Sequence, residues 1–196
     1  MAIATQDILI EMQGQILVVT FNRPAQGNRL TLDGVTALAM RLRTAATDRM
    51  VRAVVLRGAG KNFVAGIDKD AYVGDLDTAF AKMNQLVQHY HAVIRELRNI
   101  EKPVVAIVEG RVAGPGLSLM LASDFVVAAQ PTVFNCEYVQ HGLPPDGGLS
   151  FFLTRKAGWM KAQELMIFSE DFTTDDALRW NLLTSVVEAD KVHAVG

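Results

Sequence analysis

The sequence predicts an α/β fold with mainly parallel strands. Short runs rich in Val, Ala, Leu and Ile, typical of buried strands, alternate with segments whose apolar residues recur every three or four positions, as on one face of a helix. Two of these runs, Ala53 to Leu56 and Val104 to Val108, each lead into a glycine-containing turn. Strands and helices that alternate in this order favour parallel pairing of the strands.

The first half of the chain starts with a predicted β-hairpin. Ile8 to Met12 and Gln15 to Phe21 read as strands on either side of a glycine turn. From Thr31 to Asp48 the apolar residues fit one face of a helix. A short buried strand follows from Ala53 to Arg57, and Gly58 to Asp70 is a long loop.

The second half continues the alternation of helix and strand. Leu76 to Leu97 has apolar residues spaced by threes and fours, which predicts a long amphipathic helix that ends before Pro103. The remaining predicted elements are a strand over Val104 to Val108, a short helix over Gly116 to Ser123, a strand over Asp124 to Ala128, and a helix that starts at Thr173 to Asp176.

The composition indicates an ordinary globular chain. The 196 residues suit one domain, 1–196, half of them are hydrophobic, and the formal net charge is −2. No basic patch points to nucleic acid, and no apolar stretch is long enough for a membrane span. The N-terminus lacks the features of a signal peptide, and the lone Cys136 cannot form a disulfide within the chain, so we expect a cytoplasmic protein.

Two strand-to-turn units stand out, Ala65-Gly66-Ile67-Asp68 and Ala113-Gly114-Pro115-Gly116. We expect each turn to open a helix, where backbone N–H groups lack acceptors within the chain. Two such turns side by side can hold one developing negative charge, as in an oxyanion hole. The second turn contains a proline, which has no N–H to donate.

The other motifs in the sequence each lack a residue or a spacing that the corresponding type of site requires. Gly58-Ala59-Gly60-Lys61 lacks the spacing of a phosphate-binding loop, and Ser118 lacks the closing glycine of a nucleophile elbow, so a packed or capping hydroxyl is expected there. His89 and His91 lie two apart on a predicted helix and point to different faces. No metal site is predicted.

Asp146 has two readings. It lies in Leu143-Pro144-Pro145-Asp146-Gly147-Gly148, where prolines fix the backbone and glycines allow a tight turn. It can be a turn or helix-capping residue. It can also be a carboxylate held near the apolar Leu143, Phe151 and Phe152, which would raise the pKa of its carboxyl and make it a usable general base.

Several segments together resemble the crotonase (enoyl-CoA hydratase/isomerase) superfamily over essentially the whole chain, and its isomerase-type members most closely. The segments are Phe21 to Pro24, Arg52 to Gly60, Asn62 to Asp68, Lys102 to Ala106, Gly110 to Asp124, Pro145 to Gly148 and Ala177 to Val187. The resemblance implies a spiral of ββα turns that binds acyl-CoA thioesters as substrates and needs no separate cofactor. It also implies a homotrimer or dimer of trimers, and C-terminal helices that this sequence lacks.

The resemblance also implies roles for individual residues. The thioester oxygen would lie between the N–H of Ile67 and that of residue 115. Because Pro115 has no N–H, either Gly116 donates in its place or Ile67 is the single donor. The positions of the two hydratase glutamates hold Ser118 and Tyr138, Glu137 is a neighbouring catalytic alternative, and Asp146 falls where isomerases place a catalytic acid. Implied substrate-binding residues are Arg23, Ala65, Gly66, Asp68, Gly114 and Tyr138.

The missing hydratase glutamates favour isomerisation, because one carboxylate can remove a proton beside the thioester carbonyl and return it two carbons along. We therefore expect an enoyl-CoA isomerase-like enzyme. The alternatives are a hydratase-like or other crotonase reaction, such as thioester hydrolysis through Asp146 or Glu137, and an acyl-CoA-binding homologue without catalysis.

Overall fold

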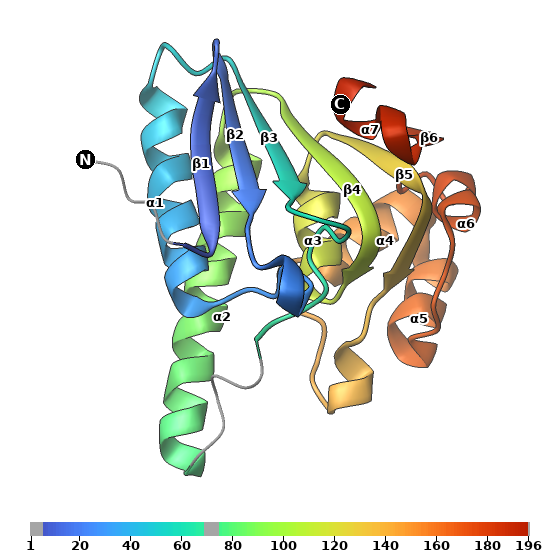
Figure 1. Cartoon of the computed structure of the whole chain (residues 1–196). Coiled ribbons are helices and arrows are strands. Elements are labelled where there is room, and N and C mark those ends of the chain that lie inside the picture. Colours follow the sequence, from blue (N-terminus) through green and yellow to red (C-terminus); the bar gives the residue numbers. More distant parts are fainter. Residues whose placement is uncertain (1–5, 69–74, 196) are drawn as a thin grey trace.

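A computed structural model describes residues 6–68 and 75–195. Within them one sheet has its six strands in sequence order, with the first pair antiparallel and every later pair parallel (Figure 1). The strands are β1 (Ile8–Gln13), β2 (Ile16–Phe21), β3 (Ala53–Gly58), β4 (Val104–Ala113), β5 (Phe125–Asn135) and β6 (Ser185–Glu188). The prediction of an α/β fold with mainly parallel pairing is confirmed.

Helices cover both faces of the sheet unequally. Figure 1 shows α1, α2 and α3 behind the sheet and α7 near its opposite face, where Val192 belongs to a small buried apolar cluster with Val18, Val55 and Ile107. The α-helices are α1 (Leu32–Thr47), α2 (Leu76–Asn99), α3 (Pro115–Ala122), α4 (Leu149–Ala157), α5 (Trp159–Phe168), α6 (Thr174–Arg179) and α7 (Val192–Val195). Short 3₁₀ segments are η1 (Pro24–Gln26), η3 (Tyr138–His141) and η4 (Ala189–Lys191).

Local chemistry explains where the predicted helices begin. The hydroxyl of Thr31 accepts the N–H of Gly34 at 3.1 Å and caps α1. Thr173 and Asp176 form a reciprocal capping box at the start of α6. Such caps each contribute about 1 kcal/mol, because they satisfy N–H groups that the first helical turn leaves without partners.

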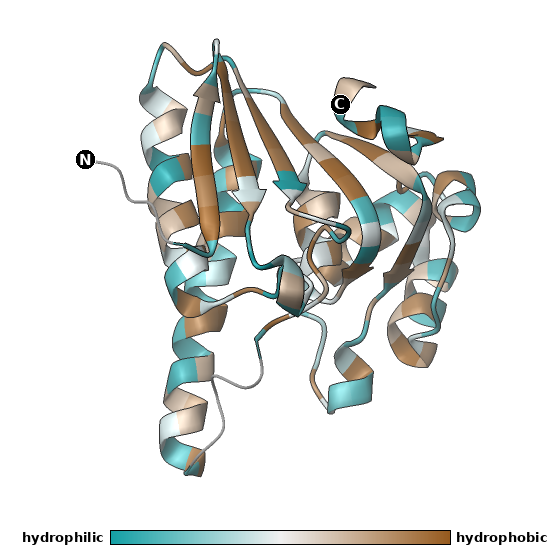
Figure 2. Ribbon diagram, viewed as in Figure 1, coloured by the Kyte–Doolittle hydropathy of each residue, from teal (hydrophilic) through white to brown (hydrophobic). Residues whose placement is uncertain are grey.

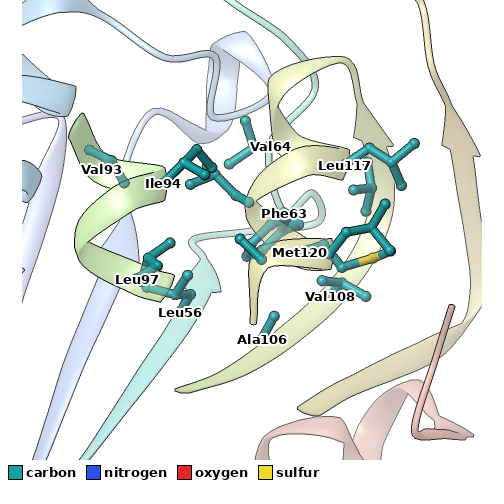
Figure 3. Close-up of a cluster of buried hydrophobic side chains, with 14 of the residues drawn as sticks. Leu56, Phe63, Val64, Val93, Ile94, Leu97, Ala106, Val108, Leu117 and Met120 are labelled. Atoms are coloured by element: carbon teal, nitrogen blue, oxygen red, sulfur yellow. The ribbon is translucent and has the colours of Figure 1, made fainter. Parts of the chain in front are cut away.

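The core lies between the sheet and the helices behind it. Figure 3 shows side chains of α2 and α3 meeting over β3 and β4, and Figure 2 shows mainly brown, apolar strands in front of α1 and α2, in which teal and brown residues alternate. The labelled members are Leu56, Phe63, Val64, Val93, Ile94, Leu97, Ala106, Val108, Leu117 and Met120, all of them buried. This packing fixes α3, and with it the turn that carries Pro115.

The central strands run further than the apolar runs predicted. β4 continues to Ala113 and β5 to Asn135, past an irregularity in their pairing at Val108 to Gly110. Gly110 has φ +66°, and a Cβ there would overlap the carbonyl of Lys61, so only glycine fits this close approach. The extensions bring Arg111 and Asn135 beside the turns that follow β3 and β4.

Some elements differ from the sequence-based prediction. α4, α5 and β6 were not predicted, because their apolar residues are partly exposed or their runs are short. Residues 65–68 are not helical, and the helix expected directly after that turn would fall within 69–74, outside the described residues. No helix within the described ranges is long and apolar enough to cross a membrane.

Candidate active site

A cavity of about 380 Å³ opens where α2 passes the turns after β3 and β4 and the segment after β5. Its wall is mainly apolar, with a few polar groups from separate parts of the chain. The lining residues are Gly66, Ile67, Met83, Leu86, Val87, Tyr90, His91, Gly114, Pro115, Glu137, Tyr138, His141, Leu143, Pro144 and Asp146. An apolar cavity with few converging polar groups is typical of a small-molecule site.

The turn after β3 presents one backbone donor to this cavity. Leu30 donates its N–H to the carbonyl of Gly66 at 3.0 Å, and Asp68 donates to the carbonyl of Leu30 at 2.9 Å. In this parallel bridge the N–H of Ile67 points away from Leu30, and no acceptor for it is found among residues 6–68 and 75–195. Ile67 lines the cavity, and its N–H has no acceptor among the described residues; its role as a donor to a thioester oxygen stays a prediction.

The turn after β4 offers no backbone N–H donor at position 115. Gly114 has φ +52°, and Pro115 is the first residue of α3, so position 115 brings a carbonyl but no N–H. The hydroxyl of Tyr90 donates to that carbonyl at 2.9 Å. The N–H of Gly116 has no acceptor in the described part of the chain, but Gly116 itself is buried behind the wall against Val64.

Asp146 places a carboxylate on the wall. The hydroxyl of Tyr138 donates to its Oδ1 at 2.5 Å, and Ser118 Oγ donates to its main-chain carbonyl at 3.2 Å. Burial raises the pKa of the Asp146 carboxyl above its ordinary value, while the hydrogen bond from Tyr138 acts in the opposite direction. A carboxylate of this kind takes up a proton more readily than an exposed one, which suits a general base.

His91 lies beside Asp146, with its Nε2 3.9 Å from Oδ2 of the carboxylate. The same Nε2 accepts the N–H of Gly147 at 3.2 Å. The Gly147 N–H and the Asp146 carboxylate thus lie around the same imidazole nitrogen at the cavity wall, whereas His89 points elsewhere and contacts Thr36.

The two tyrosines of the wall are neutral donors. Burial raises the pKa values of Tyr90 and Tyr138 well above the ordinary phenol value. Tyr90 also packs against Gly147, which has φ +57° and where a Cβ would overlap the Tyr90 ring. Gly147 thus holds Asp146 in place by a contact that only glycine permits.

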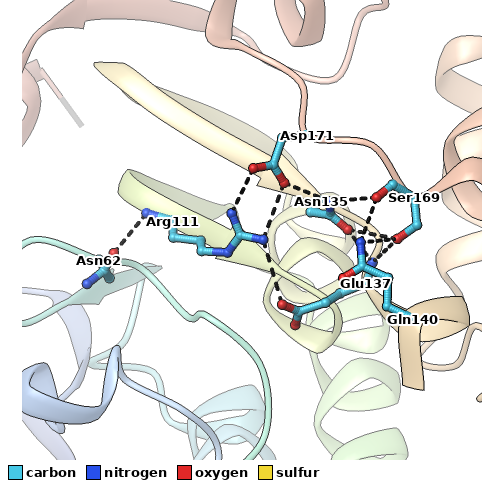
Figure 4. Close-up of polar contacts among 7 residues, drawn as sticks. All are labelled: Asn62, Arg111, Asn135, Glu137, Gln140, Ser169 and Asp171. Atoms are coloured by element: carbon cyan, nitrogen blue, oxygen red, sulfur yellow. Dashed lines mark hydrogen bonds and ion pairs between the residues drawn. The ribbon is translucent and has the colours of Figure 1, made fainter.

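Glu137 supplies the second carboxylate of the wall. Its backbone is left-handed, with φ +64°, and its N–H donates to Asn135 Oδ1 at 2.6 Å and to Ser169 Oγ at 3.0 Å. Its Oε1 lies 3.7 Å from a guanidinium nitrogen of Arg111, which pairs in turn with Asp171 (Figure 4). The side chain is 19% exposed.

Some residues predicted to bind substrate are not part of the described wall. Arg23 pairs with Asp68 at 2.6 Å and with Asp7 at 3.6 Å, and Ala65 donates its N–H to the carbonyl of Gly27 at 2.9 Å. These contacts hold the loop that carries Gly66 and Ile67. Gly66, Gly114 and Tyr138 do line the cavity.

Comparison with known proteins gives a consistent result. The family model described as enoyl-CoA hydratase/isomerase matches residues 11–195. The chain is 31% identical over 182 residues to 1,2-epoxyphenylacetyl-CoA isomerase of Escherichia coli, covering 92% of this chain and 70% of that protein. It is 32% identical over 195 residues to 4-chlorobenzoyl coenzyme A dehalogenase-1 of Arthrobacter, covering 96% and 69%.

The chain belongs to the enoyl-CoA hydratase/isomerase family. A solved enoyl-CoA hydratase from Polaromonas has a TM-score of 0.89 at 34% identity, covering 96% of this chain and 73% of that one. The crotonase-type fold predicted from the sequence is confirmed. The chain is thus an enzyme of a family that acts on CoA thioesters, and its reaction must be argued from the site.

Among the side chains that the sequence analysis did not assign to the site or its surroundings are Tyr90, His91 and Arg111. Tyr90 and His91 lie on the side of α2 that also brings Val87 to the cavity wall. Their spacing of three and four residues from Val87 was the sequence signal that could have placed them there. Arg111 had no local signal, because its role depends on Glu137 and Asp171, which are distant in the sequence.

Proposed function

We propose that this chain is an enoyl-CoA isomerase that moves a double bond from C3 to C2 of an acyl-CoA thioester. The observation that carries the proposal is the Asp146 carboxylate, which shares one apolar cavity with the free N–H of Ile67. The cavity combines a base with a raised pKa and a donor for a negative oxygen. Those are the two functions that enolate chemistry requires.

In this mechanism Asp146 takes a proton from C2, next to the thioester carbonyl. The electron pair of the C2–H bond forms the C1–C2 double bond of an enolate, and the negative charge moves to the carbonyl oxygen. When the enolate collapses, a double bond forms between C2 and C3, and the former C3–C4 double bond takes a proton at C4. One carboxylate can in principle return the proton that it removed.

The enolate oxygen would accept the N–H of Ile67. The N–H of Gly116 at the start of α3 is the remaining backbone candidate on the other side, because Pro115 cannot donate. Loss of one such donor costs about 3–4 kcal/mol in the transition state, roughly a hundred- to a thousandfold in rate. We therefore expect a slower enzyme than one with two donors facing the cavity.

The test uses a 3-enoyl-CoA and a 2-enoyl-CoA with the wild-type protein and Asp146→Asn. Isomerisation of the 3-enoyl thioester is expected, with a loss of about a hundredfold or more in Asp146→Asn, because a positioned acid–base group contributes roughly 10²–10⁴-fold. Hydration without isomerisation would assign a hydratase instead. Binding of acyl-CoA without any turnover would assign a non-catalytic homologue, and full activity in Asp146→Asn would refute the mechanism.

One observation favours a second candidate. His91 Nε2 lies 3.9 Å from Asp146 Oδ2, and relatives named 4-chlorobenzoyl coenzyme A dehalogenase are 30% and 32% identical to the chain. A carboxylate in an apolar cavity can act as a nucleophile, and an imidazole beside it can activate water. Release of chloride from 4-chlorobenzoyl-CoA, abolished in Asp146→Asn and strongly reduced in His91→Ala, would favour this reaction over isomerisation.

From the family resemblance we also propose that the chain assembles as a homotrimer or a dimer of trimers. Light scattering of the purified 21.4 kDa chain tests the assembly, because a trimer has three times that mass. A monomer at all concentrations would contradict it.

A further inference from the structure

A second cavity lies at the far ends of two helices that start at the active-site wall. Its volume is about 320 Å³, within the range of roughly 300–1,000 Å³ that is typical of small-molecule sites. α3 begins with Pro115 at the first cavity and ends beside the second, and α4 begins shortly after Asp146 and brings its last turn there (Figure 1). The eight residues of α3 span about 12 Å, and no described residue lines both cavities.

The wall of the second cavity carries more positive than negative charge. Its cations are Arg98, Arg155 and Lys156, and Asp124 is the one carboxylate among the described residues of the wall. Both oxygens of that carboxylate are already engaged, because Oδ1 accepts from Arg98 at 3.3 Å and Oδ2 accepts the N–H of Val104 at 2.9 Å. Three cations and one carboxylate leave an excess of two positive charges around the cavity.

Lys156 is the cation of this wall with the least compensation. Its side chain is half-buried, and it makes no hydrogen bond and no ion pair with the described residues. Burial and the nearby guanidinium of Arg98 lower the pKa of its ammonium group, while Asp124 acts in the opposite direction. Charges that are taken out of water are normally paired, because their desolvation is costly. An anion in the cavity would supply the missing partner.

The helix ends account for only part of this arrangement. Arg98 and Lys156 stand in the last turns of α2 and α4, where cations stabilise the helix dipole. Arg98 also donates to the carbonyl of Ala122 at 3.0 Å, which satisfies the end of α3. Exposed side chains fulfil such roles equally well. The dipoles therefore do not explain why cations of two helices line one cavity, or why Lys156 is half-buried there without a partner.

The same wall has an aromatic part. Phe151 and Phe152 lie edge to face with their ring centroids 5.4 Å apart, and the guanidinium carbon of Arg155 lies 5.2 Å from the centroid of Phe151. Phe151 is 57% exposed, so its ring has surface left for a further apolar contact. The ligand that complements this wall thus combines a double negative charge with a small apolar group.

We propose that this cavity is a ligand site for a small organic phosphate monoester, held by Arg98, Arg155 and Lys156 with its apolar group against Phe151. A phosphate monoester carries close to two negative charges at neutral pH, which matches the excess of the wall. Guanidinium groups also suit the geometry of phosphate oxygens. The site does not depend on the reaction proposed for the first cavity.

The first cavity is a poor alternative for such an anion. Its wall carries the carboxylates of Glu137 and Asp146, which repel a dianion. An anion that binds this protein is therefore expected at the second cavity, and variants of the two cavities distinguish these places.

The test is isothermal titration calorimetry of the whole chain with phenyl phosphate as the probe. We expect saturable binding, about tenfold or more tighter than that of inorganic phosphate, because only the ester adds an apolar contact. Benzyl alcohol, which has the ring without the charge, should not displace the probe. Equal affinity for inorganic phosphate would overturn the organic class of ligand, and no saturable binding up to about 10 mM would overturn the site.

Lys156→Gln and Arg155→Gln are the variants that locate the probe. Each should weaken binding by about tenfold, the loss expected for one charge-assisted hydrogen bond, and Lys156→Gln does so without breaking a hydrogen bond or ion pair of the described structure. Lys191→Gln is the matched control, because it makes the same change of charge at an exposed lysine of η4 outside the wall. It should leave the affinity unchanged, as should Asp146→Asn in the first cavity.

Two results would overturn the location. One is unchanged affinity in both Lys156→Gln and Arg155→Gln. The other is a changed affinity in Asp146→Asn, which would place the probe in the first cavity. Isomerase activity is measured separately, so its absence would refute the proposed function and leave this site standing.

Discussion

Replacing Pro115 tests the weakest part of the proposed site. Pro115 lies on the cavity wall as the first residue of α3, with its carbonyl held by Tyr90 at 2.9 Å. The change Pro115→Ala adds one N–H at this position and keeps the carbonyl and a helical backbone. A donor to an enolate oxygen contributes about 3–4 kcal/mol to the transition state, which corresponds to roughly a hundred- to a thousandfold in rate.

The substitution also has a cost, which is smaller. Without the proline ring the unfolded chain gains conformational freedom, so the folded protein loses about 0.4–1 kcal/mol of stability. This loss affects the fraction folded and not kcat of the folded enzyme. We therefore expect kcat for 3-enoyl-CoA isomerisation to rise by about a hundredfold, at the lower end of the range, with little change in KM.

The assay is the initial rate of isomerisation at saturating substrate, with Pro103→Ala as the control. Pro103 precedes β4, outside the described wall of the cavity, and its carbonyl accepts the N–H of Val54, a bond that alanine preserves. An unchanged kcat in Pro115→Ala would refute the reasoning, because it would mean that an N–H at this position does not face the enolate oxygen.

Three further outcomes follow from the geometry. Tyr138→Phe removes the hydrogen bond that lowers the pKa of Asp146, so that pKa should rise. The acid side of the pH profile of kcat/KM should then move to higher pH. An unchanged pH profile would exclude Asp146 as the titrating base. Gly147→Ala introduces a Cβ against Tyr90 at φ +57°, and urea unfolding should register a loss of about 2–4 kcal/mol, whereas a loss below 0.5 kcal/mol would contradict this packing. Burial raises the pKa of the Cys136 thiol to about 12, so thiol reagents at pH 8 should modify it only after unfolding, and rapid labelling of the folded protein would contradict its burial.

Local patterns in the sequence were sufficient for much of the fold. The hairpin of β1 and β2 and the helices α1 and α2 have unbroken periodicity, and their observed bounds differ from the predicted ones by only a few residues. The extensions of β4 and β5 were missed because polar residues such as Glu109 and Arg111 interrupt the apolar run. Those extensions depend on pairing between strands, which a local window does not contain.

The site was predictable only in part, for a similar reason. Asp146 was named from its Pro-Asp-Gly-Gly motif and Ile67 from the family resemblance, and both line the cavity, while their roles stay predictions. His91 and Arg111 acquire their roles from residues that are distant in the chain: Asp146 for the first, Glu137 for the second. Such pairings become visible only when the sheet has brought the segments together.

The sequential order of the strands has a consequence for synthesis on the ribosome. Each new strand joins the edge of the sheet already made, so early strands can pair before later ones exist. The cavity, however, needs Ile67 after β3, Pro115 after β4 and Asp146 after β5. A nascent chain that ends before Asp146 can therefore hold most of its sheet and still lack this carboxylate, so the complete cavity arises late while the framework forms early.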